Sequence, residues 1–135
     1  MEKVLILLRG CPGSGKSTVA KLLFPDAKAF AADDYQVDEN GNYDWKPERL
    51  GYAHTMCTSG VENAMREQHP QVVVHNTLTS EREIRPYAEF AAKYGYKLIS
   101  FVVENRHGNS NVHSVPDAKV VEMSERIIKS IKLIP

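Results

Sequence analysis

The sequence predicts an α/β fold of three layers, α/β/α, in which helices cover both faces of a mostly parallel sheet of four or five strands. Short apolar runs alternate along the chain with segments of helical periodicity, the order of elements that a parallel sheet requires. The first run, residues 4–8, contains no polar residue, which is typical of a strand buried on both faces. A glycine-rich loop follows it directly. Together these features place a ligand site at the carboxyl ends of the strands.

The first half of the chain contains two strands and two helices. After the strand at residues 4–8, residues 16–24 have helical spacing and end before Pro25, which cannot continue a helix. Residues 29–32 form a short second strand. Apolar residues recur on one face of residues 47–68, so we predict one long helix there, with its proline in the first turn.

The second half repeats the alternation. It contains two strands, at residues 72–74 and 97–103, and two helices, at residues 80–94 and 116–131. Ser80 and Glu83 have the spacing of a capping box at the start of the third helix, and Gly95 ends it. Residues 131–134, with the sequence IKLI, supply the fifth strand if they pair at an edge of the sheet.

Length and composition limit the class of protein. The 135 residues have the size of one domain, so we predict a single domain over residues 1–135. Hydrophobic residues make up 42% and charged residues 25%, which excludes a disordered or fibrous chain. The 17 Lys and Arg residues balance the 17 Asp and Glu residues, so no bulk positive charge indicates a nucleic-acid or membrane partner.

Neither the N-terminal residues nor the cysteines indicate export. The apolar run at residues 4–8 is far shorter than a membrane span or a signal peptide. Cys11 lies in the glycine-rich loop and Cys57 in a predicted helix, which is a poor disulfide framework. We therefore expect reduced thiols, a cytoplasmic location and no membrane partner.

The glycine-rich loop carries the strongest motif of the chain. Residues 10–17, GCPGSGKS, satisfy the P-loop pattern G-x-x-x-x-G-K-[ST] between a predicted strand and a predicted helix. In this pattern, backbone N–H groups cradle phosphates at a helix N-terminus. Lys16 would balance the charge of the β- and γ-phosphates, and the Ser17 hydroxyl would hold Mg²⁺. We predict an ATP-binding set that consists of Gly10, Cys11, Pro12, Gly13, Ser14, Gly15, Lys16, Ser17 and Thr18.

An acidic pair favours a kinase over a molecular switch. Switches and motors hold Mg²⁺ with an aspartate that ends an apolar strand, whereas here the VVV strand ends in His75. Asp33 and Asp34 instead follow the second predicted strand. A carboxylate there can face the γ-phosphate and accept the proton of an incoming hydroxyl. Asp33 leaves the strand first and is our candidate base; the alternative is that the pair only caps a short turn.

Other polar groups follow predicted strands and should converge on the same site. Asn76 and Thr77 could hydrogen-bond acceptor or phosphate groups, or could only satisfy loop backbone. Tyr35, Tyr43 and Trp45, in or beside the loop after the acidic pair, could stack on a base or pack that loop against the long helix. The histidines show no metal-ligand spacing, so we predict no zinc site.

Five motifs in the same order carry a family resemblance. They are GCPGSGKST, the DDY at residues 33–35, VVVHNT at 72–77, REIRPYAEFAAKYGYK at 82–97 and NVHSVP at 111–116. With them the chain resembles the P-loop polynucleotide 5′-hydroxyl kinases, in particular the phage-type kinase domain and the small related AAA-type and zeta-toxin-like ATP-binding kinases. The resemblance spans nearly the whole chain and implies a kinase-type P-loop NTPase fold.

The resemblance also implies roles for individual residues. The first aspartate of DDY is the general base, which transfers to Asp33. Asp34, beside it, is our candidate for substrate binding. A lid arginine near the last loop supports the leaving phosphate. Ser110 stands where many relatives carry that arginine, so Arg106, the one arginine of this loop, becomes the candidate. Gln36 and His75 replace an arginine and an aspartate of the phage enzymes.

The function that we expect is ATP- and Mg²⁺-dependent transfer of the γ-phosphoryl group to a hydroxyl, with a polynucleotide 5′-hydroxyl as the leading acceptor. Lys16 and Arg106 would stabilise charge while Asp33 takes the proton. One alternative is a kinase of a small-molecule or modified-base hydroxyl, which the neutral net charge favours. The other is an NTPase or nucleotide-sensing module without an acceptor. Because the chain is short for a kinase, a partner protein or domain could supply acceptor specificity.

Overall fold

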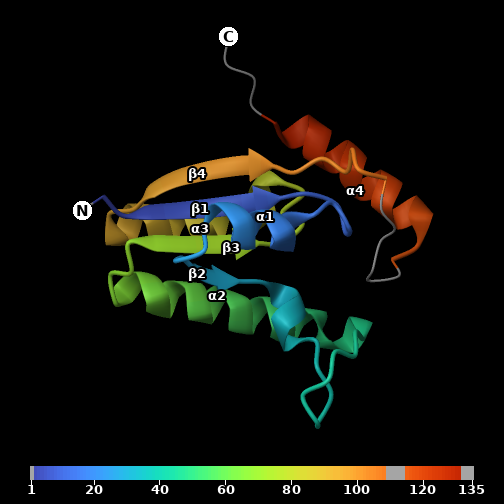
Figure 1. The fold of residues 1–135 in the computed structure, drawn as a ribbon, viewed down its shortest axis with the longest axis horizontal. Coiled ribbons are helices and arrows are strands. Elements are labelled where there is room, and N and C mark those ends of the chain that lie inside the picture. Colours follow the sequence, from blue (N-terminus) through green and yellow to red (C-terminus); the bar gives the residue numbers. More distant parts are fainter. Residues whose placement is uncertain (1, 109–114, 132–135) are drawn as a thin grey trace.

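The computed structural model describes residues 2–108 and 115–131 and contains a four-stranded sheet with the order β2-β3-β1-β4 (Figure 1). All three strand pairings are parallel, as predicted. The strands are β1 (Val4–Arg9), β2 (Lys28–Phe30), β3 (Gln71–His75) and β4 (Lys97–Val102). The helices are α1 (Lys16–Leu23), α2 (Leu50–Arg66), α3 (Glu81–Tyr94) and α4 (Asp117–Ser130), with short 3₁₀ turns η1 (Ala32–Tyr35) and η2 (Pro47–Arg49). The predicted α/β fold is therefore confirmed.

The two faces of the sheet bury different side chains, because neighbouring residues of a strand point in opposite directions. On one face, Leu5 and Leu7 of β1 pack with buried residues of α2 and α3. On the other face, Ile6 and Leu8 pack with Ala20 of α1. The uninterrupted apolar run of β1 thus follows from its central position, where both faces are covered (Figure 1).

Gly60 explains how β2 approaches the long helix α2. A Cβ atom at this position would lie 2.9 Å from Cε1 of Phe30 and 3.3 Å from the hydroxyl oxygen of Tyr35. A helix interior ordinarily disfavours glycine. Here the missing side chain lets the end of β2 and the turn η1 pack directly against α2, which brings η1 to the carboxyl edge of the sheet.

The capping box at the start of α3 forms in a modified way. Ser80 is the N-cap, and its hydroxyl accepts a hydrogen bond of 3.4 Å from the Glu83 N–H. The Glu83 carboxylate does not return to the N-cap but accepts a 2.7 Å bond from the Thr79 hydroxyl. Gly95 ends the helix in the left-handed region with φ 74°. Both predicted ends of this helix are confirmed.

Three predicted elements differ from the structure by more than one residue at an end. The second strand ends at Phe30, and the residues that follow it turn into η1 instead of continuing the strand. The long helix predicted at 47–68 is divided into η2 and α2. Ile131 lies outside any strand, and the rest of the predicted fifth strand, residues 132–134, lies outside the described residues.

Helix α4 lies beyond the carboxyl ends of β1 and β4 and not over the middle of the sheet (Figure 1). Arg9, at the end of β1, links this region: its Nε donates a 2.8 Å hydrogen bond to the Leu78 carbonyl, and its guanidinium also bonds the Ser130 hydroxyl of α4. Arg9 is only 4% exposed. None of the helices in the described ranges is both long and apolar enough to cross a bilayer.

Candidate active site

A large cleft opens at the carboxyl edge of the sheet, where the polar loops converge. Its volume is about 1460 Å³, whereas a pocket for one small ligand typically has about 300–1,000 Å³. The glycine-rich loop forms its floor, α4 forms one wall, and η1 with the segment through Trp45 and the start of α2 forms the other. The volume of the cleft therefore exceeds that of a typical pocket for one small ligand.

The glycine-rich loop has the geometry of an anion cradle. Gly15, the N-cap of α1, has φ 102°, a conformation that side chains rarely adopt, and no side chain caps the helix. No acidic residue lies in the first turn either. The N–H groups of this turn are thus available to an anion. The buried hydroxyl of Ser14 also lacks a hydrogen-bond partner among the described residues. Both features fit the phosphates of a nucleotide.

Lys16 lies where the phosphates would sit. Its ammonium donates hydrogen bonds to the carbonyl oxygens of Gly10 (2.8 Å) and Cys11 (2.9 Å), the loop's own backbone. Burial lowers the pKa of Lys16 to about 8, although the charges of Cys11 and Asp33 oppose this shift. A phosphate would replace the carbonyl oxygens as the partner of the ammonium and would restore its ordinary pKa.

Ser17 is adjacent to His75, the residue that ends β3. The Ser17 Oγ lies 3.4 Å from His75 Nδ1. Burial lowers the pKa of His75, and Lys16 adds to this effect while Asp34 opposes it, which favours the neutral form of the imidazole. Mg²⁺ usually keeps several waters and takes one or two protein oxygens plus substrate phosphates. The Ser17 hydroxyl fits that requirement as a single protein ligand.

Asp33 and Asp34 lie in η1, and the side chain of Asn76, the residue after β3, holds this turn in place. The Oδ1 of Asn76 accepts a 2.7 Å hydrogen bond from the Ala32 N–H, one residue before Asp33. Asp33 and Asp34 both line the cleft. The structure thus brings the acidic pair, Lys16 and Ser17 to one cleft, as the sequence predicts.

Asn76 and Thr77, expected to contact substrate, have internal partners. Asn76 is 6% exposed, and its Nδ2 lies 3.6 Å from the Sγ of Cys57 while its oxygen holds Ala32. Both ends of its amide are therefore used within the protein. Thr77 lines the cleft, and its carbonyl accepts a 3.2 Å bond from the Gly10 N–H.

The structure does not bring Arg106 to the cleft. Its side chain is 83% exposed and pairs with Glu104 at 2.8 Å. His107, its neighbour, does line the cleft, and its Nε2 lies 3.2 Å from the Ser14 carbonyl oxygen. Sequence analysis considered the histidines only as metal ligands and did not assign His107 to the site. The position of His107 next to Arg106, in the loop after β4, was the signal that could have identified it. Ser110 and the first four residues of NVHSVP lie outside the described residues.

The three aromatic residues near the acidic pair separate into two groups. Tyr35 packs against the buried core under α2. Tyr43 and Trp45 line the cleft and are 49% and 40% exposed. The far wall, which sequence patterns did not identify, comes from α4 and includes Lys119 and Met123.

Comparison with known proteins defines the class. A family model described as an AAA domain matches residues 5–123, and the chain belongs to this family. Human NEDD4-binding protein 2 is 30% identical over 132 residues, which cover 90% of this chain. The chain spans only 7% of the length of that relative.

Solved structures share the fold at low sequence identity. A putative kinase from Chloroflexus aurantiacus matches 76% of this chain and 59% of its own with a TM-score of 0.62 and 12% identity. A chain in the Pnkp1/Rnl/Hen1 RNA repair complex matches 99% of this chain and 40% of its own, with a TM-score of 0.60 and 21% identity. The chain therefore has a P-loop kinase-like fold.

Proposed function

We propose that the chain is an ATP- and Mg²⁺-dependent kinase that transfers the γ-phosphoryl group to a hydroxyl. The observation that carries the proposal is the placement of Asp33 in the same cleft as Lys16 and Ser17, with the Asn76–Ala32 hydrogen bond fixing the turn that presents it. In an NTPase or nucleotide sensor, Asp33 would instead orient water or only shape the turn, so the test must compare transfer with and without an acceptor. The size of the cleft, larger than a typical pocket for one small ligand, also favours an acceptor.

The chain's residues divide the reaction between charge stabilisation and proton transfer. N–H groups of the loop and the Lys16 ammonium bind the β- and γ-phosphates. Ser17 would hold Mg²⁺, which supplies further neutralisation of phosphate charge. Asp33 orients the acceptor hydroxyl and takes its proton as the hydroxyl oxygen bonds to the γ-phosphorus. The bond from that phosphorus to the bridging oxygen breaks, and ADP leaves.

Arg106 has a conditional role. To support the leaving phosphate it would leave Glu104 and turn toward the cleft when a nucleotide binds. Replacing Arg106 with Ala should then lower kcat more than nucleotide affinity. Equal kcat in the variant would remove Arg106 from the mechanism and leave His107 as the residue of this loop that contacts the cradle.

Two acceptor classes have support. The resemblance in motifs favours a polynucleotide 5′-hydroxyl, and one structural neighbour belongs to an RNA repair complex. The charges of the wall favour a small uncharged alcohol: residues 33–49 contain six carboxylates and two cations, and both cations pair with Asp44. Binding of a phosphodiester chain ordinarily uses several unpaired lysines and arginines.

The deciding experiment follows labelled γ-phosphate from ATP with Mg²⁺. Acceptors are 5′-hydroxyl DNA and RNA oligonucleotides, a panel of nucleosides, and a reaction without acceptor. Asp33→Asn should abolish transfer and leave ATP affinity within about twofold, because the carboxylate acts on the acceptor's proton. Asp26→Asn, in the exposed turn after α1, is the matched control. If the label appears only as free phosphate, at equal rates in the wild type and in Asp33→Asn, the chain is an NTPase and not a kinase.

A further inference from the structure

Gln36 stands out among the residues that line the cleft because its amide is buried and half satisfied. The side chain is 1% exposed. Its Oε1 accepts a 3.1 Å hydrogen bond from the Lys46 N–H, which fixes the orientation of the amide and leaves the NH₂ group at the other end. That Nε2 has no hydrogen-bond partner among the described residues. A buried donor without a partner costs about 1–3 kcal/mol, so a ligand that supplies an acceptor atom gains from it.

The same residue joins the catalytic turn to the aromatic wall. The Gln36 N–H donates a 3.1 Å bond to the carbonyl of Asp33, and the Gln36 carbonyl accepts a 2.8 Å bond from the Asp44 N–H. Asp44 lies between Tyr43 and Trp45, the two aromatic residues that line the cleft. A group bound at Gln36 is therefore held one short turn from the proposed base.

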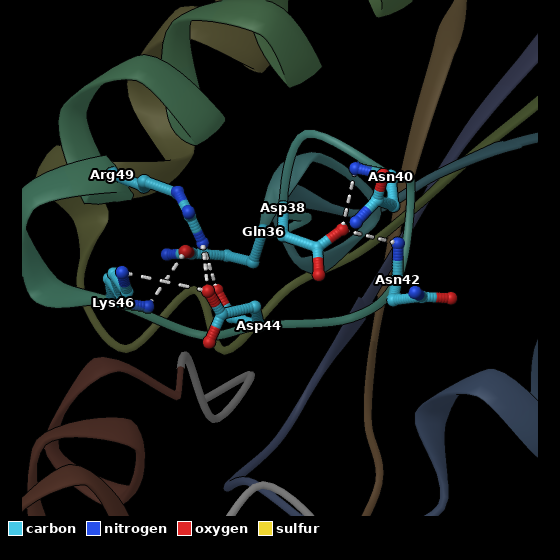
Figure 2. Close-up of polar contacts among 7 residues, drawn as sticks. All are labelled: Gln36, Asp38, Asn40, Asn42, Asp44, Lys46 and Arg49. Atoms are coloured by element: carbon cyan, nitrogen blue, oxygen red, sulfur yellow. Dashed lines mark hydrogen bonds and ion pairs between the residues drawn. The ribbon is translucent and has the colours of Figure 1, made fainter.

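The wall that carries the aromatic residues is a hairpin over residues 36–46, in which Val37 and Tyr43 form an antiparallel bridge. Figure 2 shows the Asp38 carboxylate receiving the N–H groups of Asn40 and Asn42, each at 2.9 Å, which closes the hairpin's tip. At its base, the Asp44 carboxylate lies 3.3 Å from the Arg49 guanidinium and 3.7 Å from the Lys46 ammonium. Figure 1 shows the hairpin extending away from the sheet.

We infer that Gln36, Tyr43 and Trp45 form a subsite for an uncharged planar heterocycle, such as a nucleobase, on the molecule that carries the acceptor hydroxyl. The Gln36 NH₂ would donate to a carbonyl oxygen or ring nitrogen of that ring, and the exposed aromatic faces would stack on it. Because Nε2 is buried, the side chains that cover it must shift for the ring to reach it. The inference rests on the proposed function only in naming the ring's carrier as the phosphoryl acceptor.

The negative charge of residues 33–49 also indicates which kind of molecule carries the ring. The six carboxylates of residues 33–49 oppose a second anionic group near this end of the cleft. A free nucleoside brings the ring and the hydroxyl without a phosphate. The 5′-terminal nucleoside of an oligonucleotide brings the same ring with a phosphodiester attached, so a comparison of the two separates the sources.

The chain offers its own reporter, because Trp45 is its one tryptophan. We would saturate the protein with ADP and Mg²⁺ and follow Trp45 fluorescence during titration with adenosine, guanosine, cytidine or uridine. The matching 5′-hydroxyl trinucleotides form the second arm, and ribose, which lacks the ring, the third. We expect at least one nucleoside to quench the fluorescence of Trp45 in a saturable way. The matching trinucleotide should bind more weakly, and ribose should cause no change. Absence of quenching by nucleosides and trinucleotides alike would overturn the inference and assign Gln36 Nε2 to a buried water.

Gln36→Met and Gln36→Glu together test the donor. Gln36→Met keeps the length of the side chain but removes both the NH₂ group and the oxygen that accepts from the Lys46 N–H, whereas Gln36→Glu keeps an oxygen for that contact and removes only the donor. In both variants we expect the Kd of the nucleoside to rise about five- to tenfold, the loss of one hydrogen bond. Gln71→Met, at the exposed start of β3 away from the cleft, is the matched control. If Gln36→Met fails to fold, Tyr43→Leu on the exposed hairpin should raise the same Kd. An unchanged Kd in whichever of these variants folds would overturn the inference.

This design separates the subsite from the kinase activity. Nucleoside binding that depends on Gln36, combined with no phosphoryl transfer, retains the subsite and removes the proposed function. If the rate of phosphoryl transfer to an oligonucleotide or another alcohol is unchanged by substitution of Gln36 and Tyr43, the proposed function stands and the subsite does not.

Discussion

The Oδ1 of Asn76 accepts a hydrogen bond of 2.7 Å from the N–H of Ala32, and through this contact the end of β3 positions the turn that carries Asp33. Replacing Asn76 with Leu would leave the Ala32 N–H buried without a partner. We expect the free energy of unfolding to fall by about 1–3 kcal/mol. The turn would also shift, so kcat should fall about tenfold or more while ATP affinity stays within twofold.

A conservative variant and a distant one control this prediction. Asn76→Asp keeps an oxygen for Ala32 but loses the amide nitrogen that lies near Cys57 and places a carboxylate in a buried position, so part of the activity should return. Asn63→Leu, on the exposed face of α2, should change neither quantity. Chemical denaturation and steady-state kinetics measure both. Loss of ATP affinity in parallel with kcat would show that Asn76 supports the whole cleft and not the acidic turn alone.

The pKa of Lys16, lowered by burial to about 8, predicts the direction of a pH dependence. Below that pH the ammonium is present in the free protein and can bind phosphate. Above it the free protein must take up a proton when ADP binds, so the apparent affinity falls with rising pH, by up to about tenfold per unit. Calorimetric titration of ADP between pH 7 and 9.5 measures the slope.

Variants at the same position identify the titrating group. Arginine remains charged over this pH range, so Lys16→Arg should flatten the profile whatever its absolute affinity. Lys16→Ala should bind weakly at every pH. A profile with the wild-type slope in Lys16→Arg would assign the titration to another group of the cleft.

His75 beside Ser17 predicts an unusual metal requirement. The imidazole lies 3.4 Å from the hydroxyl that would hold Mg²⁺, and Mg²⁺ prefers carboxylate and hydroxyl oxygens to ring nitrogen. His75→Asp should therefore lower the Mg²⁺ concentration that gives half-maximal ADP affinity, by several-fold. His69→Asp, before the amino end of β3, is the control. A higher Mg²⁺ requirement in His75→Asp would mean that the imidazole itself assists the metal site.

The extent to which the sequence predicts the molecule depends on how local each feature is. The glycine-rich loop is continuous in sequence, and its cradle follows from the motif. Strands β1 and β3 follow from short apolar runs, since a strand covered on both faces needs no polar residues. The contact of Asn76 with Ala32 joins residues 44 apart, and that of His107 with Ser14 joins residues 93 apart. Spacing carries no signal for such pairs.

The aromatic wall illustrates a second limit. Sequence reasoning left Tyr43 and Trp45 with two alternatives, stacking on a ligand or packing on the long helix. Which one holds depends on the hairpin that Asp38 and Asp44 organise and on where Gln36 anchors it. Such polar networks join residues by geometry and leave no periodic pattern. The buried amide of Gln36 was likewise hidden, because glutamine is ordinarily an exposed residue.

Two glycines of the same helix predict opposite effects of alanine. At Gly60 a Cβ atom would lie 2.9 Å from the Phe30 ring, which must then move. At Gly51 a Cβ atom meets nothing within 4 Å. Alanine is favoured over glycine in a helix interior by up to about 1 kcal/mol, and Gly51→Ala should gain part of that amount.

Gly60→Ala should instead lower the free energy of unfolding by about 1–2 kcal/mol, because strain outweighs the gain in helix propensity. Phe30 and Tyr35 bracket the acidic turn, so their displacement should also lower kcat while ADP affinity at the distant glycine-rich loop is retained. Thermal unfolding of both variants, with kcat and the Kd of ADP, measures this difference. Equal stabilisation by the two alanines would mean that β2 can move away from α2 without cost, and that Gly60 does not set the position of Asp33.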